Sequence, residues 1–128
     1  MKLELLPRTD LAVQAVRHLA TCRRCTSAQL AEALGTTPGY MTQVLRPLVE
    51  LGMLTSARGP NGGYELDPTA EPSFLEVIEA IEGPTEDGRC VLKDSRCDAS
   101  QPCALHDAWS AARSALLAEL QGVPVLGD

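Results

Sequence analysis

The sequence predicts a mainly α-helical protein with a small β-hairpin wing: a winged helix-turn-helix followed by a long C-terminal dimerisation helix. Three observations support this fold class. Aromatic residues make up only 3% of the 128 residues, so the core must be built from aliphatic side chains, which favours packed helices over a sheet sandwich. Several segments carry apolar residues at helical spacing between capping signals. One Gly-rich turn between two strand-like runs predicts the hairpin.

The first two helices are recognised by their caps. The first helix is expected to begin with Thr9 as its N-cap and to end near Cys22. The second has a capping-box pattern, in which the side chains of Thr26 and Gln29 each accept a hydrogen bond from the other residue's backbone amide. Gly35 is expected at its C-terminus, where a left-handed conformation commonly ends a helix.

A third helix follows a tight turn, and the pair has the pattern of a DNA-binding helix-turn-helix. Thr37 is the predicted N-cap, and Pro38 takes the first helical position, where its missing N–H costs no hydrogen bond. In such a pair the second helix enters the major groove. The exposed residues expected to contact DNA from this helix are Thr37, Tyr40, Thr42, Gln43 and Arg46.

A β-hairpin directly after the helix-turn-helix is expected to form a wing. Residues 53–57 and 64–66 are strand-like, and the segment between them is rich in glycine. Arg58 at the base of this hairpin and Asn61 at its tip suit contacts with phosphates or the minor groove. Helix-turn-helix units also serve as protein-interaction modules, and the wing is the feature that favours double-stranded DNA as the partner.

The charge distribution is compatible with DNA binding by the front of the chain, although the net charge is −6. Residues 1–66 carry seven Lys or Arg and five acidic residues, whereas residues 67–128 carry four basic and twelve acidic residues. We therefore expect a DNA-binding domain at residues 1–67. Residues 68–128 are expected to hold a linker helix, a cysteine loop and the dimerisation helix.

The expected location is the cytoplasm, with no membrane partner. The chain starts without the apolar stretch of a secretory signal, and no run is long enough to span a bilayer. Five cysteines in a reducing compartment favour metal binding or redox chemistry over disulfides.

Two further helices are predicted in the back half. Ser73 and Glu76 form another capping-box pattern, Gly83 ends that helix, and its glutamates are expected on a solvated face. The last helix is expected to run from Ala104 to about Gln121. Its apolar face exceeds what the core needs, so we expect it to contact a second copy of the chain. A symmetric homodimer would present two recognition helices to a palindromic operator.

Three cysteines and a histidine lie close together before the last helix. Cys90, Cys97, Cys103 and His106 have the spacing C-x6-C-x5-C-x2-H, and the residues between them show neither helical nor strand periodicity. Zinc sites favour closer cysteine pairs, so this spacing favours an iron–sulfur cluster, with zinc or thiol redox chemistry as alternatives. His106 is a candidate fourth ligand or, in the plainer interpretation, a surface histidine at a helix N-terminus.

A second pair, Cys22 and Cys25, forms a C-x2-C of its own at the end of the first helix. Alone, this pattern is a weak signal of a site. The expectation is therefore two exposed cysteines without a role.

In order along nearly the whole chain, these features resemble the winged-helix iron–sulfur transcriptional regulators of the Rrf type, which include IscR-like and NsrR-like proteins. The matching segments are residues 9–12, the helix-turn-helix, the wing at 58–64, residues 74–83 and the three-cysteine loop. The resemblance implies a 2Fe-2S or 4Fe-4S cluster on Cys90, Cys97 and Cys103. In IscR-like members the fourth ligand corresponds to His106. In NsrR-like members it is an aspartate from the partner's first helix, which Asp10 matches.

The function that the resemblance implies is a transcriptional repressor whose cluster senses nitric oxide, redox state or iron–sulfur status. Two alternatives remain open: a zinc-stabilised or thiol-redox winged-helix regulator, and an iron–sulfur redox protein whose winged helix docks a protein partner. An enzyme is not expected, because no nucleophile, base and oxyanion donors are arranged for catalysis.

Overall fold

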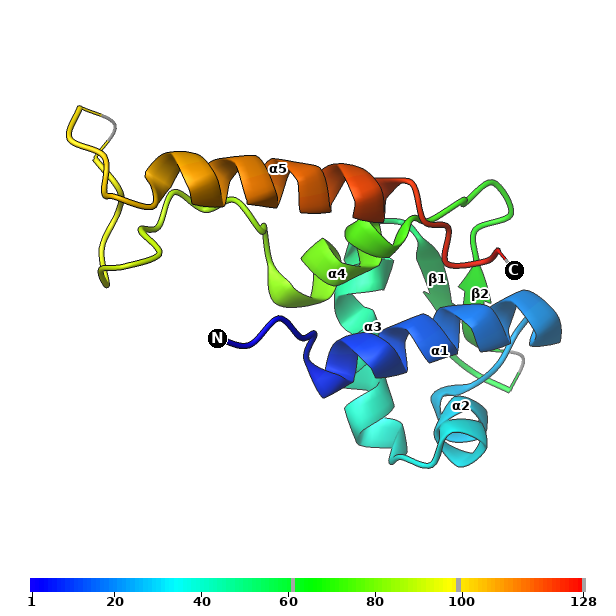
Figure 1. Ribbon diagram of the computed structural model, residues 1–128. Coiled ribbons are helices and arrows are strands. Elements are labelled where there is room, and N and C mark those ends of the chain that lie inside the picture. Colours follow the sequence, from blue (N-terminus) through cyan, green and yellow to red (C-terminus); the bar gives the residue numbers. More distant parts are fainter. Residues whose placement is uncertain (61, 99, 128) are drawn as a thin grey trace.

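In the computed structural model, which describes residues 1–60, 62–98 and 100–127, a winged helix-turn-helix is covered on one side by a long helix (Figure 1). The elements in chain order are α1 (Pro7–Cys22), α2 (Ser27–Leu34), α3 (Pro38–Glu50), β1 (Leu54–Ala57), β2 (Gly63–Leu66), α4 (Phe74–Glu82) and α5 (His106–Gln121). The two strands pair antiparallel, with Leu54 opposite Leu66. The predicted fold class is confirmed. Within the part of the chain that the structure describes, no helix is both long and apolar enough to cross a bilayer.

The core lies among α1, α2, α3 and α4. Its largest fully buried side chains include Leu19, Leu30, Met41, Leu45 and Leu48. Val125 in the C-terminal tail is also fully buried, and its carbonyl accepts a hydrogen bond from Nε of Arg17 at 2.9 Å. Aliphatic packing therefore holds the helix-turn-helix together, and the tail closes against α1.

Local capping fixes the turns around α2 and α3. Thr26 Oγ1 accepts a hydrogen bond from Gln29 N at 3.1 Å, and Gln29 Oε1 accepts one from Thr26 N at 2.9 Å. Gly35 ends α2 in the left-handed conformation, with φ of 73°. Thr37 Oγ1 accepts a hydrogen bond from Tyr40 N at 3.2 Å and begins α3. The predicted caps of both helices are confirmed.

The start of α1 differs from the prediction. The helix begins at Pro7, and Thr9 lies inside its first turn, fully buried. The Thr9 hydroxyl donates to Glu82 Oε2 at 2.5 Å, and the same oxygen accepts a hydrogen bond from the Leu6 backbone N–H at 3.0 Å. The prediction of Thr9 as N-cap was wrong. Glu76 and Glu82 of α4 are exposed as expected, but Glu82 also accepts these two hydrogen bonds from the start of α1. The cap is a carboxylate 73 residues away, beyond any local pattern.

Replacing Thr9 with valine is expected to lower the free energy of unfolding by about 1–2 kcal/mol, because the shape is kept and the donor to a charged oxygen is lost. Urea unfolding followed by circular dichroism measures this change. Thr21→Val is the matched control, since Thr21 is exposed and its hydroxyl donates to the His18 carbonyl in the same helix. An equal loss in both variants would contradict a stabilising role for the contact between Thr9 and Glu82.

The last helix lies along one side of the molecule (Figure 1). It begins at His106, because Ala104 and Leu105, where it was expected to start, form a turn. All 16 of its residues are described, and none is fully buried. Leu116 is 49% exposed, and Trp109 is half-buried. Part of the apolar face of α5 is therefore left uncovered by its own chain.

Candidate functional site

The exposed face of α3 is one candidate functional surface. Its side chains could donate to phosphates or reach base edges. Tyr40 is 42% exposed, and Arg46, six residues further along the helix, is also exposed. The hydroxyl oxygen of Thr37 is already used as the cap of α3. The structure places all the predicted contact residues of this helix on the surface: Thr37, Tyr40, Thr42, Gln43 and Arg46.

A groove of about 330 Å³ separates the wing from the two helices of the helix-turn-helix. Thr26 and Ser27 at the start of α2 line one side, Thr42 of α3 contributes to it, and Arg58 lies on the wing side. The N-terminus of a helix attracts anions through its backbone N–H groups and its dipole. The groove thus has the chemistry to accept a phosphate backbone. Asn61, predicted at the wing tip, lies outside the described residues.

The wing is fastened to the turn between α1 and α2. Cys25 and Tyr64 exchange two backbone hydrogen bonds, of 3.1 and 2.7 Å. Arg24 and Glu65 form an ion pair at 2.9 Å beside them. Gly63 has a φ of 133°, and a Cβ there would lie 2.8 Å from the Cys25 carbonyl oxygen. The position of the wing relative to α3 therefore depends on a close backbone approach that only glycine permits.

The three loop cysteines form the second candidate site. The Sγ atoms of Cys90, Cys97 and Cys103 all lie within 4.8 Å of one another, and each residue is half-buried. Between α4 and α5, the described residues 83–98 and 100–105 contain no helix or strand, only a single antiparallel bridge between Arg89 and Arg96. This bridge brings Cys90 next to Cys97. The three thiols therefore lie close together in an irregular loop, as the sequence predicted.

His106 lies beside this group, whereas Asp10 does not. His106 Nδ1 is 3.2 Å from Cys97 Sγ, and its backbone N–H donates to the Cys103 carbonyl at 3.1 Å. Asp10 is exposed in the first turn of α1, and its carboxylate accepts a hydrogen bond from Gln14 Nε2 at 2.6 Å. Among the described residues, the group of ligand atoms within 4.8 Å of one another holds the three thiols and includes neither Asp10 nor His106. Any role for Asp10 in metal binding requires a second copy.

Two of the thiols have shifted pKa values. Hydrogen bonds from the backbone N–H groups of Leu92 and Lys93 lower the pKa of the Cys90 thiol below its ordinary value. Partial burial raises the pKa of the Cys103 thiol, and the neighbouring sulfurs add to that rise. Thiolates are the metal-binding form of cysteine, so metal binding here would release protons.

A pocket of about 90 Å³ opens beside the thiols and is lined in part by Trp109 and Arg113. That volume corresponds to about three water molecules. Arg113 Nη1 lies 2.5 Å from Glu86 Oε2, so an ion pair joins α5 to the start of the loop. Three soft donors beside such a pocket fit a metal ion or a small iron–sulfur cluster.

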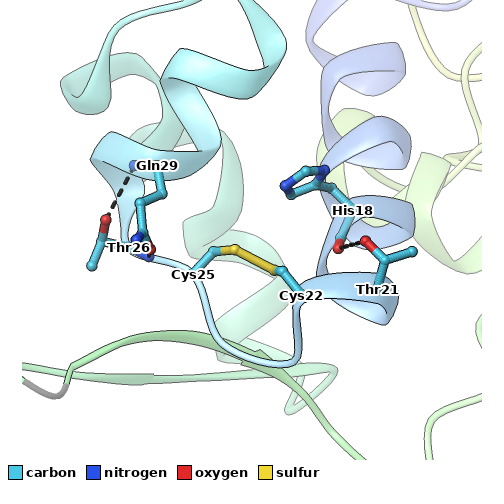
Figure 2. Close-up of a disulfide and its surroundings, with 6 residues drawn as sticks. All are labelled: His18, Thr21, Cys22, Cys25, Thr26 and Gln29. Carbon is cyan, nitrogen blue, oxygen red and sulfur yellow. Dashed lines mark hydrogen bonds between the residues drawn. A yellow bond between two sulfur atoms is a disulfide. The ribbon is translucent and has the colours of Figure 1, made fainter.

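The other two cysteines are joined in a disulfide between the end of α1 and the start of α2 (Figure 2). Cys25 is only 6% exposed and belongs to the core, and Arg23 with a φ of 64° turns the chain back so that Cys25 meets Cys22. The expectation that both cysteines are exposed was wrong, since Cys22 is half-buried and Cys25 is buried. His18, which sequence reasoning missed, lies with them. Its spacing of four residues from Cys22, one helical turn, was the available signal.

Comparison with known proteins gives a consistent result. Residues 5–126 match the model of the Rrf2 family, described as an iron-dependent transcriptional regulator. An HTH-type transcriptional regulator of Mycobacterium tuberculosis strain H37Rv is 31% identical over 118 residues, which cover 89% of this chain and 73% of that protein. The regulator IscR of Xenorhabdus nematophila is 34% identical over 83 residues, which cover 64% of this chain and 50% of that protein.

Solved structures share the fold. CymR of Staphylococcus aureus aligns with a TM-score of 0.69 at 24% identity, over 94% of this chain and 93% of that one. IscR of T. potens aligns with a TM-score of 0.70 at 21% identity, over 98% and 85% of the two chains. The two sequence relatives are both named as HTH-type transcriptional regulators, and the family model is also described as a transcriptional regulator.

Proposed function

The chain belongs to the Rrf2 family of transcriptional regulators, and we propose that it is a repressor whose operator affinity is controlled by an iron–sulfur cluster. The observation that carries this proposal is the grouping of Cys90, Cys97 and Cys103 within 4.8 Å of one another, on a chain that also carries a winged helix-turn-helix. A bound 2Fe-2S or 4Fe-4S cluster would supply a centre sensitive to nitric oxide, oxidants and iron supply.

The proposed fourth ligand is His106. Its support is the distance of 3.2 Å between His106 Nδ1 and Cys97 Sγ, which needs no second chain. The competing candidate is Asp10 of the partner subunit, by analogy with NsrR-like proteins. Asp10 accepts a hydrogen bond from Gln14 of the same helix, and its carboxylate is exposed on α1, where another chain can reach it.

We further propose that the protein acts as a homodimer on a palindromic operator. The uncovered apolar face of α5 supports this, because a 16-residue helix without a fully buried residue gains little stability from its own chain. Exposed apolar residues elsewhere add to the surface that a partner could cover: Met1, Leu3, Leu5 and Leu51. Two copies related by a twofold axis would present their α3 helices about 34 Å apart, or a multiple of that distance.

A series of contacts supports coupling between the loop and the DNA-binding part. The Thr85 backbone N–H at the start of the loop donates to Glu79 Oε2 of α4 at 2.7 Å. At the end of α4, Glu82 accepts hydrogen bonds from the first turn of α1. α4 also packs on α3. A change in the loop can therefore reach the helices that position the recognition surface.

Arg46→Ala and Arg58→Ala are each expected to reduce the magnitude of the slope of log affinity against log salt by about one. Each variant neutralises one phosphate fewer, so the DNA releases one counterion fewer on binding. Fluorescence anisotropy with a duplex selected by the protein from random DNA, over a range of salt concentrations, measures this slope. Lys2→Ala is the matched control: it removes the same charge from the N-terminal segment, which lies away from α2 and the wing (Figure 1). Salt-independent duplex binding by the unaltered protein would favour a protein-docking module instead.

A further inference from the structure

A second group of metal-ligating atoms lies at the end of α1, on the opposite side of the molecule from the cysteine loop (Figure 1). The ring nitrogen of His18 and the Sγ atoms of Cys22 and Cys25 all lie within 4.8 Å of one another. Figure 2 shows the side chains of His18 and Cys22 projecting from α1 toward Cys25, which lies in the segment before α2. Three soft or borderline donors thus converge on one point.

The local sequence explains this convergence. His18 and Cys22 are four residues apart on one helix, so their side chains lie on the same face, one turn apart. Arg23 then adopts a φ of 64°, and the Arg24 N–H donates to the Cys22 carbonyl at 2.7 Å, which reverses the chain within two residues. Cys25 is returned to a Cα–Cα distance of 6.4 Å from Cys22.

The spacing H-x3-C-x2-C suits zinc. A C-x2-C pair supplies two thiolates from one tight turn, and Zn²⁺ accepts histidine nitrogen as a third ligand with a fourth position left for water. Two thiolates on one tetrahedral zinc ion lie about 3.8 Å apart, well within the spacing of this group. A Zn²⁺ ion with two thiolates and a neutral imidazole carries no net charge, which suits the burial of Cys25.

The site is also joined to the wing. Cys25 shares two backbone hydrogen bonds with Tyr64 of β2, and Arg24 pairs with Glu65 of the same strand. Cys25 itself is packed into the core beneath α2. A metal ion bound by this turn would therefore lie where the wing is hydrogen-bonded to the helix-turn-helix.

We propose that His18, Cys22 and Cys25 bind one Zn²⁺ ion when the disulfide is reduced, and that the disulfide is the metal-free form of the same site. A dithiol supplies the two electrons and two protons that convert the disulfide into two thiols, and is itself oxidised to a disulfide. Zinc binding then displaces the two thiol protons into solvent. This site uses none of the ligands assigned to the iron–sulfur cluster.

The test uses the full chain with Cys90, Cys97 and Cys103 all replaced by alanine, so that the loop cannot contribute. The anaerobically reduced protein is titrated with Zn²⁺ against a chromophoric chelator, and with Co²⁺ to record its visible spectrum. We expect one equivalent of either metal, with the thiolate charge-transfer and ligand-field bands of tetrahedral Co²⁺. The reoxidised protein should bind neither, and a dithiol should restore binding.

Two variants in the same background identify the ligands. Cys22→Ser should lose the bound equivalent, and His18→Gln should weaken zinc binding by at least about tenfold and shift the Co²⁺ bands. Thr21→Ala is the matched control, because Thr21 is exposed on the same turn and should leave affinity unchanged. Circular dichroism shows whether each variant is folded. Absence of a stoichiometric metal in the reduced protein would overturn the proposal, as would binding that Cys22→Ser and His18→Gln both leave unaltered.

Discussion

Replacement of Cys97 by alanine is expected to abolish iron–sulfur binding and, with it, the response of operator affinity to nitric oxide. Cys97 is one of three thiols grouped within 4.8 Å, and its sulfur also contacts His106 at 3.2 Å. Its loss leaves too few soft donors to hold a cluster. Iron and acid-labile sulfide assays with a visible absorbance spectrum, on protein purified without oxygen, measure the change.

Cys22→Ser is the matched control for this prediction, because it removes a cysteine sulfur outside the loop and should leave iron and sulfide unchanged. His106→Ala and Asp10→Ala separate the two candidates for the fourth ligand. We expect His106→Ala to perturb the spectrum and Asp10→Ala to leave it as it was. Retention of full iron and sulfide by Cys97→Ala would contradict the assignment of the loop. Zinc without sulfide that Cys97→Ala loses and Cys22→Ser retains would replace the cluster with the zinc-stabilised alternative at the loop.

Gly63→Ala is expected to lower the free energy of unfolding by at least about 2 kcal/mol, from backbone strain and a forced displacement. At a φ of 133° an alanine is strained, and its Cβ would lie 2.8 Å from the Cys25 carbonyl oxygen. That contact can be relieved only if β2 moves away from the turn that holds the wing. Because the wing would be displaced, operator affinity should fall by about tenfold or more, which corresponds to a loss of about 1.4 kcal/mol in binding free energy. Denaturant unfolding and fluorescence anisotropy measure the two effects.

Gly122→Ala is the matched control for Gly63→Ala. Gly122 has a φ of −85°, and the nearest atom to an added Cβ is the Glu119 carbonyl oxygen at 3.5 Å, an ordinary contact. Stability should stay within about 1 kcal/mol of the unaltered protein. If the two alanine variants unfold at the same denaturant concentration, the wing does not depend on the close approach at Gly63.

The sequence was sufficient where the interactions are local. The hydrogen bonds that cap α2 and α3 join residues three apart, Thr26 with Gln29 and Thr37 with Tyr40. The starts of both helices can therefore be predicted from the sequence alone. The start of α1 also had a local signal, because Pro7 takes its first position, but the acceptor that caps it is Glu82, 73 residues from Thr9. The helical pattern of α4 places Glu82 on the solvated face, and its role as an acceptor for the start of α1 appears only when the two helices pack together.

The same distinction holds for the candidate sites. The spacing of Cys90, Cys97 and Cys103 in a segment without periodicity was enough to expect one shared site. The pairing of Cys22 with Cys25 and the approach of His18 were not expected, because they depend on the tight turn at Arg23, whose φ is 64°. Few residues other than glycine adopt such a φ, so the turn gives no clear signal in the sequence.

The most direct test of cluster control is the operator affinity of one anaerobic preparation, measured before and after nitric oxide removes its iron–sulfur absorbance. The proposed coupling predicts that the dissociation constant for the selected palindromic duplex changes by about tenfold or more, within the usual range of allosteric coupling. The Cys97→Ala variant should show no such change. Equal affinities of the unaltered protein in the two states would contradict the claim that the three loop cysteines control DNA binding.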